Sequence, residues 1–173
     1  MFAVGDKVVH NEYGICRITG ILKRRFPGQD EKNYYEMVPF SDDGYGTTFY
    51  IMTDHGGVLR EPMSPDQILA MIDAMPEIEP LEIPSSGNRV LDMENVKTTY
   101  NALMRSGKPQ DRVLLLRTIY RKGLQLSAKK KRVSEYESHV RENSERLLYG
   151  EIAAVMDIPV QSVERFITQR IEK

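Results

Sequence analysis

The sequence predicts an α+β protein, with an N-terminal SH3-like or Tudor-like small β-barrel followed by an all-α helical domain. Up to residue 60, short runs rich in β-branched and aromatic residues alternate with turn residues. Beyond residue 63, apolar residues recur at helical spacing instead. The charge reverses as well: residues 1–80 carry 7 Lys and Arg against 13 Asp and Glu, whereas the remainder carries 17 against 12. This asymmetry indicates two parts with different partners.

Five segments of the N-terminal part have the length and composition of β-strands. They are residues 7–10, 15–22, 34–40, 47–52 and 58–60. Turn-forming residues separate them, at 12–14, 27–30, 42–44 and 55–57. Because short strands this closely spaced usually close on themselves, we assign residues 1–62 to the β-barrel. Its acidic character and exposed strand edges favour a protein partner.

A helix and a linker are predicted over residues 63–90. Ser64, Pro65 and Gln67 have the spacing of an N-cap, a first helical position and a capping box. The apolar stripe that follows is Ile68, Leu69, Ile72 and Met75. Three prolines and the run Ser85-Ser86-Gly87 then indicate an extended connection.

Residues 91–173 are predicted to be helical and to form the second domain. One helix begins near Asp92 and ends at Gly107, one runs from Pro109 to near Gly123, and one begins at Ser127. The expected inward residues are Met93, Val96, Tyr100, Leu103 and Met104 in the first helix, Val113, Leu116, Ile119 and Tyr120 in the second, and Val133, Tyr136, Val140, Leu147 and Leu148 in the third. Residues 151–171 have the apolar spacing of a helix-turn-helix, although an ordinary helical hairpin gives the same spacing.

Several classes of protein are disfavoured by the composition. The sequence has no apolar run long enough to cross a bilayer and no signal peptide at its start, so we expect a cytoplasmic protein. The single cysteine, Cys16, lies in a predicted strand and is a weak candidate for a nucleophile. His10, His55 and His139 lack the spacing of a metal site. We therefore expect no enzyme activity, metal, cofactor or small-molecule substrate.

Basic residues concentrate between Arg105 and Arg132, where ten Lys and Arg face only Asp111. The run Lys129-Lys130-Lys131-Arg132 falls in the first turns of the helix predicted from Ser127, where positive charge opposes the helix dipole. Phosphate contact would offset that cost, so nucleic acid is one explanation and a solvated basic face is the other.

The sequence also resembles a known family. The segments VGDKVVHNEYGICRITGI, YYEMVP, TTFYIM and VLREP resemble the polymerase-interacting domain of CarD and CdnL regulators and of transcription-repair coupling factors. NALMRSGK, VLLLRTIYRK, LSAKKKR and LLYGEIA resemble the helical domain of CarD-like proteins. Coupling factors would need a motor domain, so the resemblance favours a stand-alone bacterial transcription regulator.

The resemblance implies two binding sites. The barrel would bind the β subunit of RNA polymerase, through Arg24 and the strand containing Tyr50 and Ile51, with Arg25 beside them. Tyr50 stands where the family often has an arginine. The helical domain would contact promoter DNA at the edge of the transcription bubble and modulate the stability of the open complex.

For DNA, the family places a tryptophan in the minor groove, and this chain contains none. Counting back from Ser106-Gly107 puts Met93 at that position, with Asn95 and Val96 where two arginines occur and Lys97 adjacent. A methionine can act as an apolar wedge or pack in a helix core. The alternative function is a sequence-specific regulator that reads DNA with residues 151–171.

Overall fold

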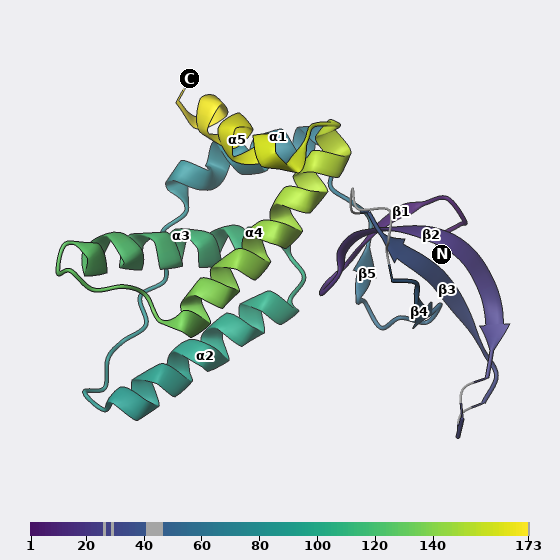
Figure 1. Ribbon diagram of the computed structural model, residues 1–173, viewed down its shortest axis with the longest axis horizontal. Coiled ribbons are helices and arrows are strands. Elements are labelled where there is room, and N and C mark those ends of the chain that lie inside the picture. The colour runs from purple at the N-terminus through teal and green to yellow at the C-terminus, as the bar shows by residue number, and fades with distance from the viewer. Residues whose placement is uncertain (26, 29, 41–46, 173) are drawn as a thin grey trace.

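The computed structural model of the protein describes residues 1–25, 27–28, 30–40 and 47–172. Five strands come first and helices follow, which confirms the predicted α+β class (Figure 1). The strands are β1 Lys7–His10, β2 Gly14–Arg24, β3 Lys32–Pro39, β4 Phe49–Met52 and β5 Leu59–Arg60. The helices are α1 Pro65–Ala74, η1 Met75–Glu77, α2 Arg89–Arg105, α3 Pro109–Ser127, α4 Glu135–Met156, η2 Val160–Ser162 and α5 Val163–Ile171. The predicted turn at 42–44 and Gln29 of the 27–30 turn lie outside the described residues.

The five strands form one antiparallel sheet in the order β4-β3-β2-β1-β5. No pairing joins β4 to β5 among the described residues, so the sheet is open there and barrel closure stays a prediction. A register shift between Ile18 and Gly20 marks a β-bulge, which bends the eleven-residue β2. One face of the sheet holds a buried cluster: Val8, Cys16, Ile18, Tyr35, Met37 and Leu59.

Helix α1 begins as predicted. The Ser64 side chain accepts a hydrogen bond from the Gln67 backbone, and the Gln67 side chain accepts one from the Ser64 N–H. Met71 is buried in this helix whereas the predicted Leu69 is only half-buried. Met71 faces the core because α1 packs against α4 and α5 rather than standing alone in a linker.

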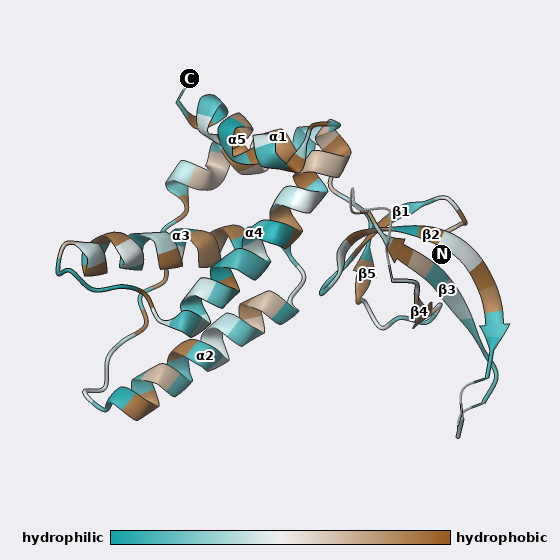
Figure 2. Cartoon of the chain, in the orientation of Figure 1, coloured by the Kyte–Doolittle hydropathy of each residue, from teal (hydrophilic) through white to brown (hydrophobic). Residues whose placement is uncertain are grey.

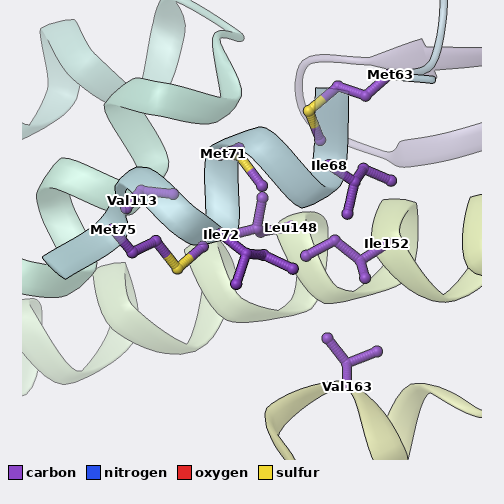
Figure 3. Close-up of a cluster of buried hydrophobic side chains, with 9 residues drawn as sticks. All are labelled: Met63, Ile68, Met71, Ile72, Met75, Val113, Leu148, Ile152 and Val163. Carbon is purple, nitrogen blue, oxygen red and sulfur yellow. The ribbon is translucent and has the colours of Figure 1, made fainter. Parts of the chain in front are cut away.

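The main helical core joins α1, η1, α3, α4 and α5 with Met63, which precedes α1 (Figure 3). It contains Met63, Ile68, Met71, Ile72, Met75, Val113, Leu148, Ile152 and Val163. A second cluster, of Tyr100, Leu115, Ile119 and Val140, holds α2, α3 and α4 together. Thus α1 shares a core with the C-terminal helices, while the division of the chain at residues 62 and 90 stays a prediction.

Four predictions for the helices were wrong. Helix α3 runs four residues past Gly123, and Tyr120 is 67% exposed because the neighbouring Leu115 fills the core instead. Helix α4 begins at Glu135, because Ser134 and Glu137 form its capping box and Ser127 still belongs to α3. Met93 does not pack inward: it is 49% exposed on α2.

Polar contacts join the sheet to the helices. Arg60 forms an ion pair with Glu151 of α4, and Arg112 donates to the Asn11 carbonyl at 2.6 Å. Burial, with repulsion from Arg60 and Arg146, lowers the pKa of Arg112 to about 10. We call this set of contacts between the β1–β2 turn, β5 and helices α3 and α4 the joint.

Two glycines with positive φ allow the close approach at the joint. A Cβ on Gly14, which has φ +77°, would lie 2.9 Å from Leu147 Cδ2. A Cβ on Gly107, with φ +68°, would overlap the side chain of Asn11. Both positions therefore need glycine for conformation and for space.

Candidate functional site

Strand β4 is an edge of the described sheet, and it carries two of the predicted site residues. Its residues pair with β3 on one side, Glu36 opposite Tyr50 and Tyr35 opposite Ile51. An edge strand presents unpaired backbone N–H and C=O groups, and a strand of another chain can bond to them and extend the sheet. The predicted binding strand is therefore placed where a partner strand could add.

The side chains of β4 face in two directions. Ile51 packs against the buried cluster of the sheet, and its backbone groups face β3: Thr53 N–H donates to the opposite residue Asn33, and hydrogen-bonded pairs recur every second residue of an antiparallel ladder. The backbone groups of β4 that face away from β3 are therefore those of Tyr50 and Met52. Tyr50 lies on the other face, where its hydroxyl donates to Glu36 Oε1 at 3.0 Å. The alternation of a strand accounts for this division.

Arg24, at the end of β2, lies over the ring of Tyr50. The centre of its guanidinium is 3.9 Å from the ring centroid, within the range of a cation–π interaction. Arg24 and Arg25 are both exposed. Arg24 and Tyr50 are 26 positions apart in the sequence. The structure brings the two side chains together at the β4 edge.

The basic run lies elsewhere than expected. Lys129 to Arg132 form the loop between α3 and α4, so their placement in the first turns of a helix was wrong. Lys130 has φ +56°, and the N–H groups of Lys130 and Lys131 donate to the carbonyls of Ser127 and Leu126. These two bonds form a Schellman motif, which ends α3.

The physical argument from the helix dipole therefore reverses. Positive charges that follow the C-terminus of α3 are stabilised by its dipole. Lys129 to Arg132 are all exposed, and they need no ligand to account for their position. They remain available for phosphate contact, but their position relative to the helix dipole is no longer evidence for a phosphate ligand.

Four of the neighbouring basic residues have structural partners. Arg112 bonds Asn11, and Arg117 donates to the carbonyls of Ile78 and Pro76. Arg121 lies 3.8 Å from Glu82, and Lys122 lies 2.5 Å from the buried carboxylate of Glu137. These four side chains join α3 to the β1–β2 turn, to the linker and to α4. A count of basic residues in the sequence cannot distinguish such structural cations from a surface that binds nucleic acid.

Exposed apolar side chains gather at the first turns of α2. Met93 is 49% exposed, Leu91 46% and Val90 74%. Asn95 and Lys97 are also exposed, and Lys97 Nζ lies 5.7 Å from the Tyr136 ring centroid. We call Val90, Leu91 and Met93 the α2 apolar patch; the brown residues at the lower end of α2 in Figure 2 include it.

Val90 and Leu91 were missed because the helix was expected to begin near Asp92. Asn88 was the available signal: its side chain accepts hydrogen bonds from the N–H groups of Val90 and Leu91. The Asp92 carboxylate instead binds Ser85 and Ser86 of the linker, and the Ser85 hydroxyl is the main cause of its lowered pKa. The patch and the basic loop lie at the end of the helical part away from the sheet (Figure 1).

The cysteine and histidines do not form a reactive centre. Cys16 is fully buried, and burial raises the pKa of its thiol to about 12, which opposes formation of the nucleophilic thiolate. His10 Nδ1 accepts from the N–H groups of Glu12 and Tyr13 at 3.1 and 3.3 Å. The described residues contain no cluster of three His, Cys, Asp or Glu side chains suited to a metal ion. Within the same part of the chain, no helix is long and apolar enough to span a membrane.

The predicted helix-turn-helix has one feature expected of its turn. Asp157, after α4, adopts the left-handed conformation with φ +53°, where glycine often occurs. Helix α5 packs Val163, Phe166 and Ile167 on the helical core, and Gln161, Ser162, Arg165 and Gln169 are exposed. A DNA-reading helix and an ordinary terminal hairpin both fit this arrangement.

Comparison with protein families identifies the sheet region. Residues 2–61 match the family model described as the CarD-like/TRCF RID domain. This segment covers all five strands, and the match confirms the resemblance noted from the sequence for this part of the chain. The family interacts with RNA polymerase and is not an enzyme family, so a transcription-related role follows. No curated protein matches the chain.

Proposed function

We propose that the protein regulates transcription by binding the β subunit of bacterial RNA polymerase through β4 and contacting promoter DNA through its helical part. The observation that carries this proposal is the family match over residues 2–61, on a sheet whose β4 edge is unpaired among the described residues. In this scheme the sheet acts as a Tudor-like module in the cytoplasm. Backbone groups of Tyr50 and Met52, which face away from β3, pair with a polymerase strand, and Arg24 and Arg25 meet acidic residues beside it.

The DNA contacts would be weak and would not depend on sequence. Lys129, Lys130, Lys131 and Arg132 contact phosphates, while Asn95 and Lys97 of α2 lie beside the apolar patch and extend the surface. Met93 acts as the wedge in a distorted minor groove, supported by its exposure on α2. Tethering by polymerase raises the effective concentration of DNA contacts, so low intrinsic affinity suffices to modulate the open complex.

Binding of the full chain to purified polymerase β lobe tests the first half of the proposal. Arg24→Glu reverses the charge, and Met52→Pro removes an N–H of β4 that faces away from β3, so both should weaken binding at least tenfold. Arg141→Glu is the control, because Arg141 is an exposed cation on α4. Melting temperatures of all variants separate loss of binding from loss of folding. Failure of the wild-type chain to bind would reject the proposal.

A second candidate is a sequence-specific regulator that reads DNA with α5. The left-handed Asp157 and the exposed Gln161, Arg165 and Gln169 are compatible with it. Selection from random duplexes with the full chain alone separates the two functions. A sharp enriched motif lost in Arg165→Ala supports direct readout, and enrichment without any motif supports phosphate contact.

A further inference from the structure

A groove of about 670 Å³ lies where the sheet meets the end of α4. The β1–β2 turn and the end of β3 form one wall, and the last turns of α4 with the turn before η2 form the other. Its volume is in the range of binding sites for small ligands and short peptides. Strand β4 contributes no described residue to its lining, so the groove is distinct from the proposed polymerase-binding edge.

The groove is lined by apolar side chains that remain accessible. Phe40 is 39% exposed, Tyr13 48% and Val160 37%. Exposed aromatic side chains supply much of the binding energy in recognition sites. An apolar segment of a partner would bury these rings.

The charges around the apolar lining have a positive excess. Lys7 and Arg146 line the groove, against one carboxylate, Asp157, among the described lining residues. Arg17 adds a third cation at the rim, with its guanidinium 5.4 Å from the Phe40 ring centroid. Lys7 Nζ lies 4.7 Å from the same centroid.

Both lining cations have donors to spare. Lys7 Nζ donates to the Ala154 carbonyl at 3.2 Å, and an ammonium group has three N–H donors. Arg146 Nη2 donates to the Glu12 carbonyl at 3.1 Å, and a guanidinium has five. The existing bonds hold the two cations in place while leaving donors for a carboxylate.

We propose that this groove binds a short peptide segment of a partner protein that has apolar side chains and at least one carboxylate. The apolar side chains lie on Phe40 and Tyr13, and the carboxylate binds Lys7 or Arg146. This inference does not rest on the proposed polymerase and DNA contacts.

Small residues of α4 keep the groove open. Gly150, Ala153 and Ala154 face it, and a Cβ added at Gly150 would meet no atom within 4 Å. A glycine inside a helix lowers its stability relative to other residues. Gly150→Leu should therefore fill the groove while leaving the melting temperature unchanged or higher.

The test is a phage-displayed heptapeptide library selected on the immobilised full chain. We expect enriched peptides that combine aromatic or aliphatic residues with Asp or Glu. Synthetic copies, measured by fluorescence anisotropy, should bind Gly150→Leu and Arg146→Glu at least tenfold more weakly than wild type. Arg165→Glu, an exposed cation on α5, should bind as wild type does.

Three outcomes would overturn the inference. The library could yield no enriched sequence, or basic peptides, or peptides whose affinity is unchanged by Gly150→Leu. Peptides that lose affinity in Met52→Pro but not in Gly150→Leu would belong to the β4 edge. Because polymerase binding is measured separately, failure here leaves the proposed function standing.

Discussion

Arg60 at the end of β5 and Glu151 in the C-terminal half of α4 form a two-pronged ion pair across the joint. Nη1 lies 2.7 Å from Oε1 and Nη2 lies 2.5 Å from Oε2. Oε1 also accepts from the Met63 N–H at 2.9 Å, and Arg60 Nε donates to the Gly107 carbonyl at 3.2 Å. One residue pair thus ties the last strand, the start of α1 and the α2–α3 turn to α4.

Removing Arg60 should destabilise the protein more than neutralising Glu151. The Glu151 side chain is 2% exposed and that of Arg60 27%, so Arg60→Ala leaves a buried carboxylate without its cation. We expect Arg60→Ala to lower the free energy of unfolding by about 3 kcal/mol. Glu151→Gln should cost less, because Arg60 can reach solvent. Urea denaturation measures both.

A surface pair provides the control for this comparison. Arg121 and Glu82 are separated by 3.8 Å and are largely exposed, so Arg121→Ala should change stability by no more than about 0.5 kcal/mol. The double change Arg60→Met with Glu151→Leu should recover only part of the loss, because it removes the unpaired charge but leaves the Met63 N–H without its acceptor. Equal losses for Arg60→Ala and Arg121→Ala would contradict the importance given to the joint.

His10 makes the stability depend on pH. Its Nδ1 accepts two backbone N–H groups, and burial lowers the pKa of His10 below 6.5, with Glu12 partly opposing the shift. A lowered folded pKa means that the folded protein binds fewer protons than the unfolded chain. Stability is therefore complete above pH 6.5 and is lost as the pH falls through the folded pKa of His10.

Urea midpoints between pH 7.5 and pH 5 measure this effect. His10→Asn keeps a side-chain acceptor but does not titrate, so its midpoint should vary less over this range than that of wild type. His139→Asn is the control, since His139 is exposed on α4. The same pH dependence in wild type and His10→Asn would show that another group is responsible.

The corrected start of α4 can be checked with two serines. Ser134 accepts from the Glu137 N–H, and Glu137 in turn accepts from the Ser134 N–H, so Ser134→Ala should cost about 1 kcal/mol. Ser127→Ala should have almost no effect, because Ser127 is the last residue of α3. Thermal unfolding of the two variants gives the comparison. A larger loss for Ser127→Ala would favour a helix start at Ser127.

The proposed DNA contacts separate into an ionic and an apolar part. Replacing Lys129, Lys130 and Lys131 by Gln should reduce the slope of log affinity against log salt by about 0.9 for each phosphate contact removed. Met93→Ser should leave that slope unchanged and shorten the lifetime of the open complex. Fluorescence anisotropy on duplex DNA and a promoter dissociation assay with polymerase measure the two effects.

Leu116→Ser is a control for loss of an apolar group at a packed site. Leu116 packs against the main helical core, so this change should lower the melting temperature, whereas Met93→Ser should not. Met93 would be a structural residue if its replacement destabilised the protein as much. An unchanged open-complex lifetime would remove Met93 from the DNA surface.

Local signals in the sequence were sufficient for the strands and for the start of α1. The strands lie where β-branched and aromatic residues alternate with turns, and Ser64 and Gln67 form the capping box predicted from their spacing. The strand with Tyr50 and Ile51 was also correctly located. These features depend on neighbours within a few positions, which the chain order itself supplies.

The errors arose where two signals of similar strength competed. Ser127 and Ser134 both have the form of an N-cap, but Lys130 takes a left-handed conformation that ends one helix between them. Tyr120 and Leu115 both suit a helix core, and the position of α4 decided between them. Neither choice can be made from spacing alone, because each depends on a distant partner.

The sequence by itself determined the α+β class, the order of the elements, the family of residues 2–61 and the separation of acidic from basic halves. Only the tertiary structure decided which basic side chains are free at the surface. Arg112 and Lys122 look like their neighbours in the sequence, yet they bond Asn11 and Glu137. Charge and periodicity are properties of single positions, whereas burial and pairing depend on residues brought together by folding.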